Sequence, residues 1–309
     1  MRFLSLLTLC SLLVGAAAPK RPRILGVAQI ALNVSDIEKS RGFYKDFLGF
    51  AEPFEIRNPD GSLALSFIKI NDYQYIELFP GLKAGQDRLN HIALYTDDVK
   101  LMRAWLGSQE IKVPPTVGRG RNGDLNFSVT DPEGHKIEFI QYEAGGWSMR
   151  GKGKYMSEFR VSTHMLHVGI LVGDVEAAMK FYAGVLGFRE TWRGAPPGKN
   201  LAWINMTVPD GEDYIEFILY KDLPPADRRG SAHHLCLETP DVRKATAELE
   251  SRPFRRFYPY PLEPRLGVNR RWQLNLYDPD GTRTELMEPQ TVDGLPVPSS
   301  SAPLPRQTK

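Results

Sequence analysis

Apolar and polar residues follow one order in four separate stretches of the chain. Each stretch begins with Gln or His, continues through mostly apolar residues, and ends on Asp seven positions later. The sequence then changes to a helical pattern, and this Asp stands where an N-cap residue would lie. The stretches are 29–36, 91–98, 167–174 and 234–241, and the helices expected after them are 37–48, 99–106, 175–186 and 242–249.

A short segment with a central Glu also recurs four times, at 75–78, 136–139, 214–217 and 283–286. Two copies follow the turn sequences 131–134 and 278–281, in which Pro is the second residue and Gly the fourth. This composition favours a type I turn. We therefore expect a hairpin that leads into a strand carrying the Glu.

The two halves of the chain repeat each other at a longer offset. Phe43 and Tyr44 recur 138 positions later as Phe181 and Tyr182, and the same offset relates Gln29 to His167. Repetition of this kind predicts an α+β protein built from four modules, each a strand, a helix and several strands. The predicted segments are a signal peptide at 1–17, domains at 24–143 and 165–289, a linker at 144–164, and a disordered Pro/Ser-rich tail at 290–309.

The composition fits two globular domains and gives no sign of a nucleic-acid partner. The 309 residues are 42% hydrophobic and 25% charged, and the formal net charge is only +2. Two cores of ordinary size are therefore possible. A basic surface for nucleic acid is not expected.

The N-terminus has the features of an export signal. Arg2 precedes an apolar run at 3–14 and small residues at 15–18. This order is typical of a secretory signal peptide, so we expect a periplasmic or secreted protein with no stable membrane association after cleavage. Cys10 would be removed with the signal, which leaves Cys236 as a single core thiol and excludes an internal disulfide.

The recurring Gln, His and Glu positions are candidate metal ligands. The spacing from the head of each first strand to the Glu is nearly constant, at 48, 47, 49 and 51 residues. One set of four is Gln29, Glu77, His91 and Glu138, and the other is His167, Glu216, His234 and Glu285. Oxygen-rich sets with one or two imidazoles suit a divalent ion with open positions, such as Zn, Ni, Mn or Fe(II).

A single Glu or His in a strand usually has no ligand role, so this prediction depends on the recurrence. Alternation along a strand places Gln29 and Ala31 on one face, and Ile30 and Leu32 on the other. We expect the apolar face to pack on the helices and the ligand face to be concave. The other histidines, His135, His164 and His233, are expected to be structural or at the surface.

These segments resemble the vicinal oxygen chelate superfamily, which includes glyoxalases, extradiol dioxygenases and bleomycin resistance proteins. The motifs FYKDFLGF, FYAGVLGF, DPEGHKIEF and DPDGTRTEL carry the resemblance over about residues 24–289. It implies βαβββ modules paired into two glyoxalase-like domains, with curved mixed sheets around a metal. It also implies that the two sets are metal ligands, and that Glu138 and Glu285 are catalytic bases that move a proton through an enediolate. Whether a set closes within one domain, or mixes Gln29 and Glu77 with His234 and Glu285, stays open.

Three functions agree with this sequence. The first is an exported lyase or isomerase of glyoxalase type that acts on a small vicinal-oxygen substrate. The second is a ring-cleaving dioxygenase using Fe(II) on His167, His234 and Glu285, although Glu216 would be an extra ligand and the stretch 266–276 has no histidine. The third is a non-catalytic small-molecule binder, with Trp192, Trp203, Tyr214 and Trp272 as candidate lining residues. The expected partner is a small molecule, and the protein is expected to be a monomer or homodimer.

Overall fold

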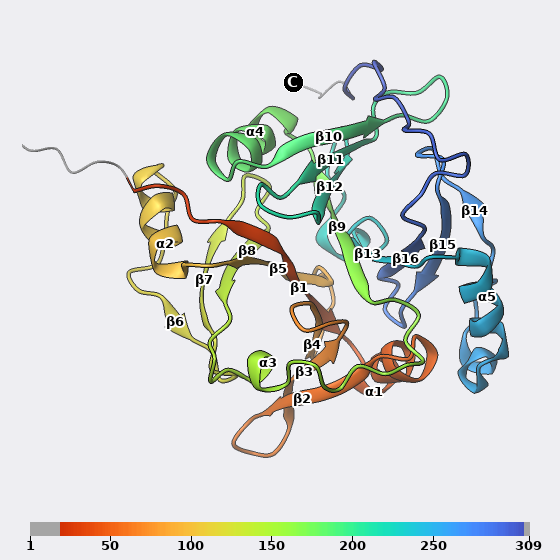
Figure 1. Ribbon diagram of the computed structural model, residues 1–309, viewed down its shortest axis with the longest axis horizontal. Coiled ribbons are helices and arrows are strands. Elements are labelled where there is room, and N and C mark those ends of the chain that lie inside the picture. The colour runs from red at the N-terminus through yellow and green to blue at the C-terminus, as the bar shows by residue number, and fades with distance from the viewer. Residues whose placement is uncertain (1–18, 306–309) are drawn as a thin grey trace, which may run out of the picture.

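The computed structural model describes residues 19–305, which form two curled eight-stranded sheets with few helices (Figure 1). The expected signal peptide and the last four residues of the chain lie outside the described residues. Among the helices that are described, none has the length and apolar character needed to cross a membrane. The predicted α+β class is confirmed.

The first sheet has the strand order β2-β3-β4-β1-β5-β8-β7-β6. Strand β1 pairs in parallel with β4 and antiparallel with β5, and β5 pairs in parallel with β8, so two modules join at the centre of one mixed sheet. The strands are β1 (Ile24–Val34), β2 (Ala51–Arg57), β3 (Leu63–Lys69), β4 (Tyr75–Pro80), β5 (Leu89–Thr96), β6 (Gly118–Arg119), β7 (Leu125–Thr130) and β8 (Lys136–Gln141).

The second sheet repeats this arrangement, in the order β10-β11-β12-β9-β13-β16-β15-β14. Its central strands β9 and β13 are antiparallel, and each has a parallel neighbour that carries the recurring Glu. The strands are β9 (His164–Val172), β10 (Arg189–Gly194), β11 (Trp203–Thr207), β12 (Tyr214–Leu219), β13 (His234–Glu238), β14 (Arg265–Leu266), β15 (Trp272–Tyr277) and β16 (Arg283–Met287).

The recurring Asp residues begin the helices, as the sequence predicts. The carboxylates of Asp36, Asp98, Asp174 and Asp241 accept hydrogen bonds from backbone N–H groups of the first turn. In the first and third modules the α-helix continues as a π-helical turn. The helices are α1 (Ile37–Arg41), η1 (Gly42–Phe47), α2 (Val99–Ser108), α3 (Trp147–Arg150), α4 (Val175–Met179), η2 (Lys180–Val185), η3 (Ala226–Arg228), α5 (Val242–Ser251) and η4 (Pro253–Phe257).

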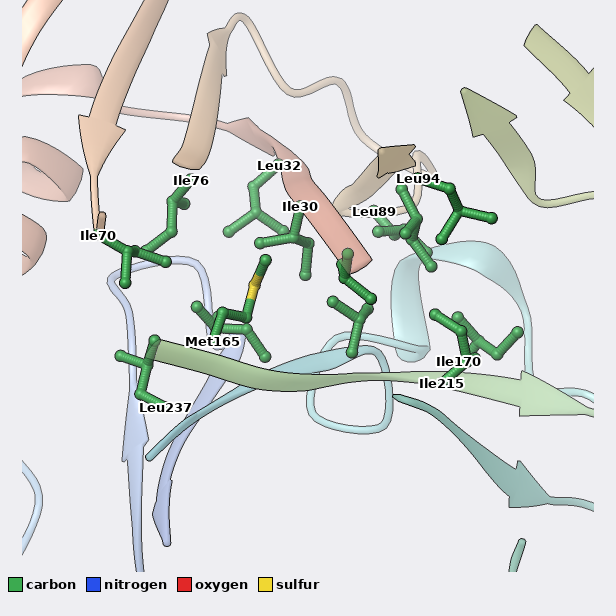
Figure 2. Packing of buried hydrophobic residues seen from close by; sticks show 14 of the residues in the cluster. Ile30, Leu32, Ile70, Ile76, Leu89, Leu94, Met165, Ile170, Ile215 and Leu237 are labelled. Carbon is green, nitrogen blue, oxygen red and sulfur yellow. The ribbon is translucent and has the colours of Figure 1, made fainter. Parts of the chain in front are cut away.

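The apolar faces of the two sheets pack against each other. Ile30 and Leu32 of the first sheet lie in the same buried cluster as Met165, Ile170 and Ile215 of the second (Figure 2). The sequence predicts that this face packs on helices. Helices form only part of its environment, because the apolar face of the other sheet also covers it. Two curved sheets each bury one apolar face most completely by sharing it, and this leaves both ligand faces pointing outward.

A matching pair of hydrogen bonds joins the two halves. Tyr44 on η1 donates from its hydroxyl to Asp278 Oδ2 at 3.2 Å, and Tyr182 on η2 donates to Asp131 Oδ2 at 3.0 Å. Both carboxylates also organise the predicted turns, since Asp131 and Asp278 accept backbone N–H groups from the residues that follow them. The repeated Tyr and the repeated Asp–Pro turn therefore meet across the domain boundary.

Removing either tyrosine hydroxyl should destabilise the protein. Burial raises the pKa of Asp278 to about 6, so its carboxylate depends on the donors around it. We expect Tyr44→Phe and Tyr182→Phe each to lower the free energy of unfolding by about 1–3 kcal/mol, measured by urea denaturation at pH 8. Tyr155→Phe is the control, because Tyr155 is 54% exposed. Unchanged stability in both buried variants would show that these bonds do not hold the halves together.

The segments after β8 and β16 are both anchored to the sheets. In the linker, Trp147 N donates to Asn122 O, and the buried ammonium of Lys69 donates to Gly151 O and Lys154 O. The tail is predicted to be disordered, and its described part, to residue 305, forms backbone hydrogen bonds with Arg270, Arg193 and Leu201. Arg193 is on β10, the edge strand of the second sheet, where such a bond satisfies an otherwise unpaired group.

Candidate metal centres

The strand register brings the first set of candidate ligands together. Ala31 on β1 lies opposite Glu77 on β4 and opposite His91 on β5. His91 Nε2 is 3.5 Å from Glu77 Oε2 and 3.7 Å from Glu138 Oε2. Gln29 lines the same cavity, which has a volume of about 260 Å³. All four residues of the set therefore face one space on one sheet.

The second set is arranged in the same way around Gly169. This glycine on β9 lies opposite Glu216 on β12 and His234 on β13. His234 Nε2 is 3.0 Å from His167 Nε2, 3.4 Å from Glu216 Oε2 and 3.6 Å from Glu285 Oε2. The donor atoms of His167, His234 and Glu285 all lie within 4.8 Å of one another.

Each set closes within one sheet. The alternative in which Gln29 and Glu77 would join His234 and Glu285 is excluded by the sheet order, because the two pairs belong to different sheets. The physical reason is that modules one and two share a continuous hydrogen-bonded sheet through β1 and β5. The ligand faces of the two sheets consequently point away from each other.

In the first sheet the histidine ring is oriented so that one nitrogen is free for a cation. In the first sheet, His91 Nδ1 lies 2.9 Å from Asn90 Oδ1, which selects the tautomer with an unprotonated Nε2. That Nε2 is buried and has no hydrogen-bond partner. In the second sheet, His234 Nδ1 lies 2.8 Å from Ala232 O, but its Nε2 lies 2.9 Å from Arg283 Nη2 and 3.0 Å from His167 Nε2. The Nε2 atom of His91, a buried acceptor without a donor that faces two carboxylates, fits a divalent ion.

Gly169 makes room for the ring of His234. A Cβ atom at position 169 would lie 2.0 Å from His234 Cε1 and 2.1 Å from its Nδ1. The first sheet has Ala31 at the equivalent position and Gln29 in place of a histidine. The two centres are thus not copies: the second holds two imidazoles close together, whereas the first holds one.

Burial gives the candidate ligands unusual proton affinities. It lowers the pKa of His91 and of His167 to about 3, so both imidazoles are neutral at physiological pH. Burial also raises the pKa of Glu138 and of Glu285 to about 7. The pKa of Glu77 is raised well above its usual value, first by burial and then by the charge of Glu138. Neutral imidazole is the form that binds metals.

A cation beside each set was missed from the sequence. Lys136 and Arg283 stand two positions before Glu138 and Glu285, so they share the ligand face of β8 and β16 and line the two cavities. Arg283 Nη2 lies 2.9 Å from both ring nitrogens of His234. The sequence does contain a signal for these cations. The second and fourth modules have a basic residue where the first and third modules have Tyr75 and Tyr214.

The remaining histidines have partners outside the two ligand sets. His135 and His233 contact each other across the domain boundary, with Nε2 atoms 3.2 Å apart, and His164 pairs with Asp213. Their predicted structural role agrees with these contacts.

Of the candidate aromatic residues, Trp192 and Trp203 line the second cavity, Tyr214 packs on the ring of His167, and Trp272 packs under Arg243. Cys236 is a free, buried thiol.

Comparison with known proteins gives one family for both sheets. Residues 26–139 and 164–286 match the profile of the Glyoxalase/Bleomycin resistance protein/Dioxygenase superfamily. Over 120 residues the chain is 32% identical to the uncharacterised protein YwbC of Bacillus subtilis, which covers 35% of this chain and 90% of that protein. It is 31% identical over 121 residues to lactoylglutathione lyase of Haemophilus influenzae. That match covers 36% of this chain and 87% of the lyase.

Two solved structures resemble the whole two-sheet arrangement. The 2,3-dioxygenase LapB from Pseudomonas sp. KL28 superposes with a TM-score of 0.68 at 18% identity, over 91% of this chain and 98% of that chain. The Mn(II)-bound glyoxalase from Novosphingobium aromaticivorans superposes with a TM-score of 0.65 at 19% identity. This match covers 86% of this chain and 83% of that chain. At these identities the likeness is one of fold.

Proposed function

Because the chain belongs to the glyoxalase/bleomycin resistance protein/dioxygenase superfamily, we propose that it is a metal-dependent lyase or isomerase of glyoxalase type. Its substrate would be a small molecule with oxygens on adjacent carbons. The observation that carries this proposal is the four-donor set of the second sheet. The Nε2 atoms of His167 and His234 lie 3.4–3.9 Å from the carboxylates of Glu216 and Glu285, and the second carboxylate is available for proton transfer.

Glu285 is the proposed base of this centre. Its pKa of about 7, raised by burial and lowered by Arg283, lets the carboxyl take up and release a proton near neutral pH. Arg283, which also lines this cavity, favours an anionic oxygen on the substrate beside that carboxylate. A divalent ion held by the set (Zn, Ni, Mn or Fe(II)) would supply Lewis acidity to the substrate oxygens. Glu138 is the equivalent proposed base of the first sheet.

We also propose that the protein is exported, on the basis of residues 2–18 alone. Glutathione is mainly cytosolic, so export favours a substrate other than a glutathione adduct. The lactoylglutathione lyases among the relatives therefore support the reaction class more than the substrate.

Proton exchange at carbon tests this function directly. Zinc-, nickel- or manganese-loaded protein should exchange the α-hydrogen of acetoin in D2O, or convert phenylglyoxal, followed by proton NMR with and without glutathione. We expect Glu285→Gln to reduce turnover by about 100- to 10,000-fold, which is the usual contribution of a general acid–base. Glu138→Gln is the matched variant of the other sheet. Full activity in both variants would exclude these two carboxylates as bases.

One observation favours a second function, ring cleavage by a dioxygenase. Two histidines and one carboxylate, His167, His234 and Glu285, form the triad that holds non-haem Fe(II) in oxygenases. Glu216, 3.4 Å from His234 Nε2, would fill a position that such an enzyme leaves open. Oxygen uptake by the Fe(II)-loaded protein with catechol would favour this second function over the first.

A further inference from the structure

A groove lined by aromatic rings lies at the boundary between the two halves of the chain. None of its lining residues belongs to either ligand set, and its volume of about 730 Å³ is within the range of about 300–1,000 Å³ that small-molecule sites occupy. The first half contributes α1 and η1, and the second half contributes η4, the loop after it and the turn after β15 (Figure 1). The aromatic lining residues are Phe43, Phe254, Phe257, Tyr258, Tyr260 and Tyr277.

The lining rings form a continuous series across this boundary. Tyr258 stacks on Phe43, with ring centroids 6.1 Å apart. The ring centroid of Tyr260 lies 5.5 Å from that of Tyr258 and 5.4 Å from that of Tyr277, with interplanar angles of 66° and 60°. Phe257 and Tyr260 are exposed, at 64% and 44%. Rings tilted against one another in this way can face a single ligand from more than one side.

The fold does not account for these rings, because the matching segment of the first half has none. The segment after α5 corresponds to the segment after α2 at the offset of 143 positions that relates His91 to His234. At that offset, the aromatic residues and their counterparts are Phe254, Phe257, Tyr258 and Tyr260 against Ile111, Pro114, Pro115 and Val117. The same module therefore folds with aliphatic residues and prolines here, so the rings are a feature of the groove.

Carboxylates outnumber cations along the groove. The acidic lining residues are Asp36, Glu38, Asp46 and Asp278, and the basic one is Lys39. Lys39 pairs with Asp36 at 3.4 Å, and Glu38 pairs with Arg41. Asp46 is exposed and forms no ion pair within residues 19–305. The groove therefore carries an excess of negative charge, which favours a cationic ligand.

The rings already attract cations from the chain itself. The guanidinium carbon of Arg256 lies 4.7 Å from the ring centroid of Phe257, and that of Arg255 lies 5.9 Å from the ring centroid of Tyr258. Neither arginine is among the residues that line the groove. They therefore cover ring surface outside it and leave the surface inside it accessible to a ligand.

The groove favours a cation that donates no hydrogen bonds, because most of its carboxylates are already engaged. Asp36 accepts backbone N–H groups at the start of α1, and Asp278 accepts the hydroxyl of Tyr44. A primary ammonium needs acceptors in place of its water. A quaternary ammonium has no N–H group and interacts through ring faces and charge, which are the two features that the groove offers.

We propose that this groove binds a small, soluble quaternary ammonium compound, with its methyl groups against the tyrosine rings and its charge balanced by the carboxylates. A cation over aromatic faces gains an attraction that a neutral molecule of the same shape does not. The site is separate from both metal centres, so this proposal goes beyond the proposed function and does not depend on it.

Choline and its neutral counterpart 3,3-dimethyl-1-butanol test the proposal, because the alcohol has a carbon in place of the charged nitrogen. The full chain is titrated calorimetrically with each compound, with and without zinc. We expect choline to bind about 10- to 100-fold more tightly than the alcohol in both conditions. Tyr260→Leu, which keeps an apolar side chain but removes the ring, should reduce that preference at least about fivefold, and Tyr260→Phe should keep it.

Tyr220→Leu is the matched control, because Tyr220 is 38% exposed and lies outside the groove. It should leave the preference for choline intact. Equal binding of the two compounds, failure of both to bind, a preference that requires zinc, its persistence in Tyr260→Leu or its loss in Tyr220→Leu would each overturn the proposal. Binding to phosphatidylcholine vesicles without binding of free choline would also overturn it, because the partner would then be a lipid surface.

Discussion

Purified, metal-loaded protein should contain two divalent ions per chain, and His91→Ala and His234→Ala should each remove one of them. Each variant deletes an imidazole that faces two carboxylates of a single sheet. Changes to groups that only orient a ligand cost 10–100-fold in metal affinity, so loss of a ligand should cost more than about 100-fold. Elemental analysis after dialysis measures the stoichiometry, and the double variant should hold no ion.

His164→Ala is the control for this prediction. His164 is on β9 with His167, but it pairs with Asp213 and Glu238 rather than with either ligand set. It should therefore keep both ions. If either single variant lost both ions, the sites would not be independent, contrary to closure of each set within its own sheet. Two ions retained in His234→Ala would exclude the second set as ligands.

A glycine-to-alanine change probes the second centre without touching a ligand. A methyl group at Gly169 would overlap the imidazole of His234, so Gly169→Ala should weaken metal binding in the second sheet only. Ala31→Gly in the first sheet is the matched change, and it should leave both ions bound. Equal metal content and affinity in Gly169→Ala and the unmodified protein would show that the ring of His234 adjusts without cost.

The local features of the fold could be predicted because they depend on neighbouring residues. The N-cap role of Asp36 follows from the helical pattern after it, and the hairpin before Glu138 follows from the turn composition at 131–134. The pairing of modules was not predictable from four similar patterns. It depends on which central strands share hydrogen bonds, and each of the four first strands offers a comparable edge.

The sequence predicted which residues form the candidate sites, but not the side chains and contacts that surround them. The eight positions followed from recurrence at nearly constant spacing. The role of Gly169 depends on a contact with His234, on a strand far away in the sequence, and no local pattern reports it. The tail after Met287 shows the same limit, because a Pro/Ser-rich composition does not reveal its backbone bonds with Arg270, Arg193 and Leu201.

Metal affinity should fall as the pH is lowered below 7, and it should fall more steeply in the first sheet. A metal ion displaces protons from its ligands, so affinity drops about tenfold per pH unit for each proton displaced. The imidazoles do not compete in this range, because burial holds the pKa of His91 and His167 at about 3. The competing protons are on carboxyls whose pKa is raised by burial.

The two sheets differ in how many such carboxyls they have. In the first sheet burial raises the pKa of both Glu77 and Glu138, so protonation of two carboxyls opposes metal binding. In the second sheet the raised pKa of about 7 belongs to Glu285, which predicts about a fivefold fall in affinity between pH 7 and pH 6. The affinity of the first site should therefore fall more steeply during acidification.

Competition with a chromophoric zinc chelator measures each slope separately, using His234→Ala to isolate the first site and His91→Ala to isolate the second. Adding Glu285→Gln to the His91→Ala protein should weaken binding and also flatten its dependence on pH, because the competing carboxyl is gone. Equal slopes in the two single variants would contradict the difference in proton count. An affinity that rises on acidification would contradict proton displacement at both centres, since a ligand that must lose a proton can only bind more weakly as protons become more abundant.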